Sequence, residues 1–318
     1  MNRYLTVNRI EFAVTYLCNS ECRHCQLGDE KKRIFPSHID KNVSTEIVRK
    51  VGEKYGPESI MTFGGEPLLY PEAVYAIHRE ATRVGIPSRE VITNGFWSTE
   101  TRRIQEMADG LVKSGANEVD ISVDFFHQEF IPIEIVKKTA ESLLKAGMEH
   151  ISWNPCWVVS KEHDNPYDRR TRAILEELKD LPIEDGEGNV IQPEGRAIFL
   201  LTGFLPSRMK MPKGKCGDVP YTEELDSVKG ICVEPDGRIG VCKEFYIGNA
   251  SETDIIDLIE NYDPFKIPEA KAIVQNGMEG LTDWARNHGI EPDPKGYYNI
   301  CHMCTDIRRR ARGRESLG

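Results

Sequence analysis

Three cysteines, separated by three residues and then by two, carry the most specific chemistry in this sequence. Cys18, Cys22 and Cys25 directly follow an apolar segment expected to be a strand, so one short loop can bring all three thiolates to one centre. Thiolates are the protein ligands of iron–sulfur clusters, which usually take four. Three thiolates would leave one iron of the cluster without a protein ligand, so that a chelating substrate or cofactor could bind there. The alternatives are a zinc site completed by His24, or three unrelated buried cysteines.

A second motif, Gly64-Gly65-Glu66-Pro67, stands at the end of the second expected strand. Two glycines at such a place let the backbone approach a ligand closely. The Glu66 carboxylate can accept hydrogen bonds from an ammonium group. Taken alone, this tetrapeptide indicates only a turn, so its value lies in its position after the three cysteines.

The two motifs together resemble those of the radical S-adenosylmethionine (radical SAM) superfamily, over roughly residues 8–200. The resemblance implies that Cys18, Cys22 and Cys25 hold a [4Fe–4S] cluster whose open iron chelates the amino and carboxylate groups of SAM. One electron, from a donor such as ferredoxin or flavodoxin, then cleaves SAM to methionine and a 5′-deoxyadenosyl radical, which abstracts a substrate hydrogen. The resemblance also implies that His24 lies near the adenine and that Gly64–Pro67 contacts SAM.

Polar residues at the ends of the later strands are further cofactor candidates. By resemblance, these positions contact the methionine part and the ribose of SAM, although each residue taken alone suits a turn or a strand cap equally well. The candidates are Thr93, Asn94, Ser122, Asp124 and Asn154. Asp124 and His127 are also candidate catalytic residues, for substrate contact or proton handling. The alternative for His127 is a hydrogen-bonded structural histidine.

A second set of cysteines follows in the last third of the chain. The segment Cys232–Cys242 is typical of a hairpin that turns at Asp236-Gly237, and Cys301 and Cys304 form a second close pair. Two such pairs make a site of four thiolates, which suits either a structural zinc or a second iron–sulfur cluster.

This second set resembles the SPASM and twitch extensions of radical SAM maturases, which hold auxiliary [4Fe–4S] clusters. Only five cysteines follow Gly203, so we expect one auxiliary cluster, with zinc as the alternative. Cys216 is then either a replacement for Cys232 as a ligand or a catalytic thiol that donates a hydrogen atom to a substrate radical. The segment Asn94–Trp97 is similar to one in a peptide epimerase of the superfamily. Cys156 is expected to be a buried small hydrophobe.

Short apolar runs alternate with segments of helical periodicity up to about Gly203, which predicts a parallel sheet with helices outside it. The expected strands are Arg9–Tyr16, Ser59–Phe63, Glu90–Thr93, Glu118–Val123, His150–Val159 and Asn189–Leu201. The expected helices are Thr45–Tyr55, Pro71–Val84, Thr99–Ser114, Ile133–Ala146 and Asp168–Leu181. We therefore predict an α/β fold, a partial (β/α)6 TIM-like barrel at 1–203, with a small Cys-rich auxiliary cluster domain at 204–318. An open doubly wound sheet is the structural alternative.

Composition narrows the classes of function. The net charge of −10 argues against sequence-independent binding to nucleic acid, which needs a basic surface. The sequence has no apolar run long enough to span a bilayer and no apolar signal core, so we expect a cytoplasmic protein. In such a protein, nine cysteines are not expected to form a disulfide framework. The basic run Arg308–Arg314 is interpreted as a solvated tail, with a binding patch as the alternative.

These patterns predict a radical SAM enzyme that modifies a peptide or protein by epimerisation or crosslinking. The first alternative keeps the radical chemistry but acts on a small molecule, by oxidation or rearrangement. The second alternative is a non-enzymatic zinc- or iron-binding protein, which accounts for the cysteines but not for Gly64–Pro67.

Overall fold

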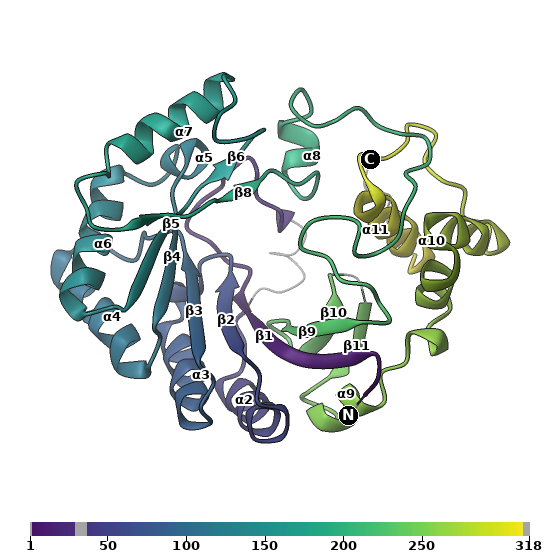
Figure 1. Ribbon diagram of the computed structural model, residues 1–318, viewed down its shortest axis with the longest axis horizontal. Helices are drawn as coiled ribbons and strands as arrows, with labels where there is room; N and C mark the ends of the chain where they lie inside the picture. The colour runs from purple at the N-terminus through teal and green to yellow at the C-terminus, as the bar shows by residue number, and fades with distance from the viewer. Residues whose placement is uncertain (1, 29–36, 244, 314–318) are drawn as a thin grey trace. The chain divides into compact units, whose positions relative to one another are not determined.

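The computed structural model describes residues 2–28, 37–243 and 245–313, which divide into two units (Figure 1). The larger unit comprises Asn8–Phe204 and Val233–Gly237. The smaller unit comprises Met1–Val7, Leu205–Cys232 and Arg238–Gly318. In the described ranges, no helix is both long enough and apolar enough to cross a membrane.

Parallel strands and covering helices build the larger unit, in the strand order β1-β2-β3-β4-β5-β7. The strands are β1 (Leu5–Thr15), β2 (Ser59–Gly64), β3 (Ser88–Thr93), β4 (Glu118–Ser122), β5 (His150–Asn154) and β7 (Glu184–Asp185). The helices are α2 (Lys41–Tyr55), α3 (Pro71–Arg83), α4 (Thr101–Ser114), α5 (Phe125–Gln128), α6 (Ile133–Ala146), α7 (Pro166–Glu176) and the 3-10 turn η1 (Pro67–Leu69). Figure 1 shows α2, α3, α4 and α6 along the outer side of the strands. The predicted α/β class with a TIM-like parallel sheet is confirmed.

Local sequence explains the boundaries of these elements. Asp40 accepts hydrogen bonds from the first free backbone N–H groups of α2, and Asn165 does the same for α7. Helices α4 and α6 end at Gly115 and Gly147, both in the left-handed conformation that favours glycine. Such caps fix where each helix begins and ends, and therefore where the loops at the strand ends lie.

The sixth predicted strand, Asn189–Leu201, is wrong over most of its length. Only β8 (Asn189–Val190) is extended, and it pairs with β6 (Cys156–Trp157) in a separate two-stranded sheet. The apolar end of the predicted strand forms the short helix α8 (Ala197–Leu200) instead. Pro193 and Gly195, the latter with φ +53°, interrupt the extended backbone between the two.

The fifth predicted strand is also shorter than expected. It ends at Asn154 because Pro155 has no N–H to donate to a ladder, and the chain resumes as β6 at Cys156. The two-residue strand β7 was not predicted, since Glu184 and Asp185 are polar and exposed.

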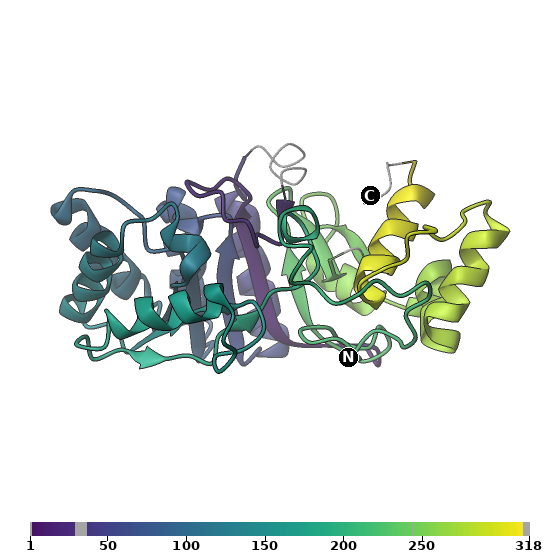
Figure 2. The ribbon, with the colours of Figure 1, turned by 90° about the horizontal axis from the view of Figure 1, so that it is seen from above.

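The smaller unit packs helices against a short sheet in which β9, β10 and β11 follow the first residues of β1. Its elements are β9 (Val228–Val233), β10 (Arg238–Cys242), β11 (Phe245–Asn249), α9 (Ile255–Glu260), η2 (Pro264–Lys266), α10 (Pro268–Asn287) and α11 (Ile300–Ala311). Figures 1 and 2 both show α11 beside α10. Helix α10 is broken by non-helical backbone at Asn276 and Gly277.

The basic run does not begin as a solvated tail, as the sequence analysis interpreted it. Arg308–Arg310 lie inside α11, and the Arg308 side chain is only 5% exposed. Arg314 lies outside the described residues. Helix α11 packs Ile300, Met303 and Ile307 into the core of this unit. Because Arg308 lies on the same helix next to Ile307, its side chain is buried as well.

Candidate active site and a second thiol site

The loop with the first three cysteines is joined to the Gly-Gly-Glu-Pro motif by backbone hydrogen bonds. Gly65 donates its N–H to the carbonyl of Thr15 at 2.7 Å, and Glu66 donates to the carbonyl of Leu17 at 2.9 Å. A Cβ on Gly64 or Gly65 would lie 2.2 or 2.1 Å from a carbonyl oxygen of Thr15 or Leu17. The two glycines therefore permit close contact between two segments of backbone, and their approach to a ligand stays a prediction.

Glu66 ties the motif to the end of β3. Its Oε1 accepts hydrogen bonds from Thr93 Oγ1 at 2.8 Å and from the Leu68 N–H at 3.1 Å, and its Oε2 accepts from the Asn94 N–H at 2.8 Å. Burial raises the pKa of Glu66 to about 7, and these three donors act in the opposite direction. An ionised carboxylate has about four acceptor positions, so the described residues leave one for a further donor. Pro67 begins η1, directly after Glu66.

Asn94 connects this network to the first cysteine. Its Nδ2 donates to Asn19 Oδ1 at 2.8 Å and lies 3.7 Å from Cys18 Sγ. Burial raises the pKa of the Cys18 thiol to about 11, and charges on Glu66, Cys22 and Cys25 act in the same direction. The charges of both other thiols therefore act on Cys18, and the meeting of the three sulfurs at one centre stays a prediction.

His24 lies in the cysteine loop beside two rings from α5. Its ring centroid is 5.0 Å from that of Phe126 and 4.9 Å from that of His127. Burial lowers the pKa of His24 to about 4. Its Nδ1 is a buried atom without a hydrogen-bond partner among the described residues. His24 therefore has an unused hydrogen-bonding nitrogen within the cysteine loop.

Asp124 is fully buried and organises the neighbouring residues. Its Oδ1 accepts from the backbone N–H groups of Phe126 at 2.8 Å and His127 at 3.0 Å. Its Oδ2 accepts from His127 Nδ1 at 2.7 Å and from the Cys156 N–H at 3.1 Å. Although burial opposes ionisation, the charges of His127 and His24 and these hydrogen bonds lower the pKa of Asp124 to about 2.

Ligand-capable atoms of His24, Asp124 and His127 lie within 4.8 Å of one another, a geometry that could hold a metal ion. All four acceptor positions of Asp124 are already occupied by protein donors, however, so a metal would have to displace one of them. Asp124 therefore holds His127 in place beside Cys22, whose charge acts on the His127 ring.

Of the remaining strand-end candidates, Asn154 is held within the sheet and Ser122 lies opposite it. Asn154 Nδ2 donates to Asp120 Oδ2 at 3.3 Å, and its Oδ1 accepts from Asn189 Nδ2 at 3.1 Å. Ser122 pairs with Asn154 in the β4–β5 ladder. Cys156 also lies here, and burial raises the pKa of its thiol, with Asp124 and Asp168 acting in the same direction.

Arg196 and Glu129, which lie far from the cysteine loop in the sequence, hold the loop in place. Arg196 donates its backbone N–H to the Cys25 carbonyl at 2.9 Å and its Nη1 to the Glu21 carbonyl at 2.6 Å. Arg23 pairs with Glu129 through contacts of 2.7 and 3.0 Å. No motif predicts these contacts, because Arg196 and Glu129 meet the loop only through the tertiary fold.

A second set of thiols gathers in the smaller unit. The charges of Cys216, Cys242 and Cys301 all act on Cys304, whose pKa is raised chiefly by burial. Burial likewise raises the pKa of Cys216, with Cys242 and Cys301 acting in the same direction. These four cysteines pack against one apolar core, in which Cys304 is buried. The four ligands predicted from the sequence included Cys232 and not Cys216.

The break in α10 holds the loop that carries Cys216. Met278 donates its N–H to the Gly214 carbonyl at 2.9 Å. A Cβ on Gly277, where φ is +59°, would lie 2.5 Å from the same carbonyl oxygen. The kink thus exposes a helical N–H group that fixes the chain two residues before Cys216.

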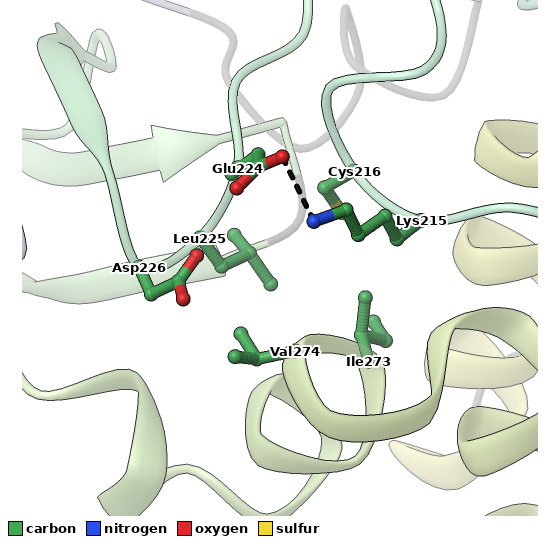
Figure 3. A pocket seen from close by; sticks show the side chains of 7 residues that line it. All are labelled: Lys215, Cys216, Glu224, Leu225, Asp226, Ile273 and Val274. Atoms are coloured by element: carbon green, nitrogen blue, oxygen red, sulfur yellow. Dashed lines mark ion pairs between the residues drawn. The ribbon is translucent and has the colours of Figure 1, made fainter.

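A hollow opens beside Cys216 (Figure 3). It is lined by Lys215, Cys216, Glu224, Leu225, Asp226, Ile273 and Val274, with an ion pair of 2.9 Å between Lys215 Nζ and Glu224 Oε1. Its volume of about 10 Å³ has room for at most about one water molecule. This hollow does not offer Cys216 a site of substrate size.

Comparison with known proteins agrees with the motif analysis. Residues 12–168 match the model of the radical SAM superfamily. A probable GTP 3′,8-cyclase of Sulfurisphaera tokodaii is 26% identical over 178 residues, covering 54% of this chain and 53% of that protein. A putative peptide biosynthesis protein YydG of Bacillus subtilis is 26% identical over 166 residues, covering 51% and 48%. The chain spans about half the length of these two relatives.

Among solved structures, native anSMEcpe with bound AdoMet has a similar fold. Its TM-score is 0.54 at 14% sequence identity, and the likeness covers 96% of each chain. At this identity the likeness establishes the fold alone.

Proposed function

Because residues 12–168 form a radical SAM domain, we propose that this protein is a radical SAM enzyme that modifies a peptide or protein, by epimerisation or crosslinking at an unactivated C–H bond. The observation that carries the proposal is the cysteine loop, which the backbone of Gly65 and Glu66 locks to the end of β1. The relative named as a peptide biosynthesis protein supports the substrate class.

The residues of the larger unit fit the cofactors of this family. Cys18, Cys22 and Cys25 would hold a [4Fe–4S] cluster, and Glu66 keeps one acceptor position for the amino group of SAM. His24 lies in the same loop and keeps an unused ring nitrogen, and its place near the adenine of SAM is part of this proposal. When bound, the cluster and SAM supply a 5′-deoxyadenosyl radical that abstracts a substrate hydrogen. The chain itself would position both groups.

Asp124 and His127 act as a positioning pair in this proposal, rather than as a proton relay. Every acceptor position of Asp124 is used inside the protein, and His127 is held by its Nδ1. Thr93 and Asn94 hold Glu66, while Ser122 and Asn154 line the ends of neighbouring strands. A contact of these four residues with SAM remains a prediction.

We also propose one auxiliary [4Fe–4S] cluster in the smaller unit, ligated by Cys216, Cys242, Cys301 and Cys304. The mutual electrostatic influence of these thiols supports this set. Cys232 in the place of Cys216 is the alternative, and Cys216 would then be the catalytic hydrogen donor. Thiolates alone also suit zinc, so the metal must be identified directly.

Anaerobic reconstitution tests both cluster assignments. We expect about eight irons per chain, the content of two [4Fe–4S] clusters, whereas about four irons with one zinc would favour a structural extension. Cys216→Ala should lower the count by about four and Cys232→Ala should leave it unchanged, since four irons form one cluster. The reverse pattern would make Cys232 the ligand.

Incubation with dithionite and SAM, or with ferredoxin or flavodoxin as the electron donor, tests the reaction. The candidate substrates are peptides encoded beside this gene, read by mass, and GTP. The GTP-cyclase relatives favour a small molecule as the second candidate. Turnover of GTP without change in any peptide would replace the peptide proposal. SAM cleavage that survives in Cys22→Ala would reject the radical SAM assignment itself.

A further inference from the structure

The tip of the β9–β10 hairpin, Val233–Gly237, belongs to the larger unit, whereas the chain on either side of it belongs to the smaller unit. The Gly237 N–H donates to the Glu234 carbonyl at 2.9 Å and closes the turn, and Gly237 has the positive φ of +85° that favours glycine. Cys232 and Cys242 lie in the strands that enter and leave this tip. The hairpin tip is thus part of the unit that holds the cysteine loop.

A buried carboxylate at this tip contacts the start of the cysteine loop. The Tyr16 hydroxyl donates a hydrogen bond to Oε2 of Glu234, which lies 218 residues further along the chain. Glu234 is 3% exposed and Tyr16 is 2% exposed, so the hydrogen bond is formed inside the protein. A hydrogen bond in such a place is stronger than one in water. Loss of either partner therefore removes a contact that solvent does not readily replace.

The Tyr16 side chain packs against both segments that form the proposed cluster site. Leu27, near the end of the cysteine loop, and Phe63, at the end of β2, pack against the small core that Tyr16 forms with Ala13. The next residue, Leu17, accepts the backbone hydrogen bond that joins the loop to the Gly-Gly-Glu-Pro motif. A partner that holds the Tyr16 hydroxyl also fixes the direction of the ring, and the ring in turn supports the start and the end of the loop.

We propose that Glu234 is a positioning residue for the cysteine loop and acts through Tyr16. The proposal rests on the radical SAM function proposed above, in which this loop holds the cluster. A functional site is preorganised when its ligand-bearing residues are held by a second set of contacts. Tyr16 stands two residues before Cys18, and the Glu234 carboxylate holds its hydroxyl. The hairpin tip therefore supports the loop on which the thiols are carried.

Hydrogen–deuterium exchange in the iron-free full chain tests this support. Tyr16→Phe, which keeps the ring, and Glu234→Met, which keeps the length of the side chain, should each speed amide exchange at residues 17–28 about tenfold, because local opening becomes easier. The double variant should exchange no faster than the faster single variant, since all three remove the same hydrogen bond. Glu234→Gln keeps an acceptor oxygen and should stay near the parent. Asp236→Asn is the matched control, because it removes a charge from an exposed carboxylate of the same turn.

The reconstituted protein supplies a second readout, in the formation of 5′-deoxyadenosine from SAM. At full iron content, Tyr16→Phe and Glu234→Met should lower kcat/KM for SAM about tenfold, because small displacements of reacting groups are costly. Glu234→Gln and Asp236→Asn should retain the parental value. Rescue by the glutamine variant separates the loss of the hydrogen bond from the loss of charge.

Three results would overturn the proposal. The first is unchanged exchange at residues 17–28 in both single variants. The second is faster exchange confined to 233–237, or equally fast in α4, since either would reflect a loss of stability without a specific effect on the loop. The third is a parental kcat/KM in both single variants at full iron content. If Glu234→Met does not fold, Tyr16→Phe decides between these outcomes. A parent protein that cleaves no SAM refutes the proposed function, whereas the exchange experiment needs no iron and still decides this inference.

Discussion

Gly65 offers the sharpest test of how the cysteine loop is positioned. A Cβ at Gly65 would stand 2.1 Å from the carbonyl oxygen of Leu17, 2.6 Å from its carbonyl carbon and 2.9 Å from the carbonyl carbon of Tyr16. The residue does not have a positive φ, so Gly65→Ala introduces a steric conflict without backbone strain. Because every clashing atom belongs to the backbone, the two segments must move apart by about 1 Å to restore ordinary contact.

The magnitude follows from the bonds that such a movement breaks. The hydrogen bonds from Gly65 to Thr15 and from Glu66 to Leu17, at 2.7 and 2.9 Å, would both be lost. Each lost backbone bond costs about 1 kcal/mol, and more where a buried donor stays unpaired. We therefore expect a loss of about 2–4 kcal/mol in unfolding free energy. For a unit of this size, this corresponds to a fall of roughly 5–15 °C in Tm.

The assay compares Gly65→Ala with Gly203→Ala in the iron-free protein. Gly203 has an ordinary φ, and a Cβ added to it would have no heavy atom within 4 Å, so this control adds the same methyl group without conflict. Thermal unfolding should show the loss for Gly65→Ala alone, and reconstitution should then yield about four irons fewer per chain. Equal melting temperatures and iron contents in the two variants would refute the backbone lock.

Three further changes test other parts of the structure. Gly277→Ala should lower the iron content by about four per chain, because its Cβ would meet the Gly214 carbonyl oxygen at 2.5 Å; Gly289→Ala, with the same kind of φ and open space around it, should not. Burial and the charges of Asp120 and Glu118 raise the pKa of Glu90 to about 8. The folded state therefore binds this proton more tightly than the unfolded state, and its stabilising effect is present below about pH 4.5 and lost as the pH rises to about 8. Glu90→Gln should raise Tm relative to the parent at pH 8.5 by several degrees more than at pH 4.5, and an equal change at both pH values would contradict this. Asp124→Asn should cost about 2–4 kcal/mol in a denaturant titration, since an amide nitrogen cannot accept the hydrogen bonds that the carboxylate accepts; a loss below about 1 kcal/mol would show that the network is dispensable.

The sequence predicted the parts of the site whose chemistry is local. Three thiols within eight residues can meet in one loop whatever surrounds them, and Gly64–Pro67 follows its strand directly. The contacts of Asn94 with Asn19 and of Arg196 with Glu21 could not be predicted, because they form only when segments distant in sequence are placed side by side. The assignment of Asp124 as a reactive group also needed the structure, which shows its acceptor positions filled.

The errors in the fold have physical causes. The run Ala197–Leu201 is continuously apolar, and periodicity cannot distinguish a buried strand from a short helix in such a run. The burial of Arg308 within the basic run could not be predicted for a related reason. Successive residues on a helix point about 100° apart, so only one of three adjacent arginines shares a face with Cys304, and composition alone does not reveal which.

The backbone hydrogen bonds that hold the two ends of the cysteine loop use no sulfur atom. Thr15 and Leu17 anchor its start and Arg196 anchors its end, through backbone groups that oxygen does not attack. We expect the backbone frame of this loop to persist if a bound cluster is lost by oxidation, because these hydrogen bonds do not depend on iron. Repair after oxidation then requires only new iron, sulfide and reduced thiols, without refolding of the chain.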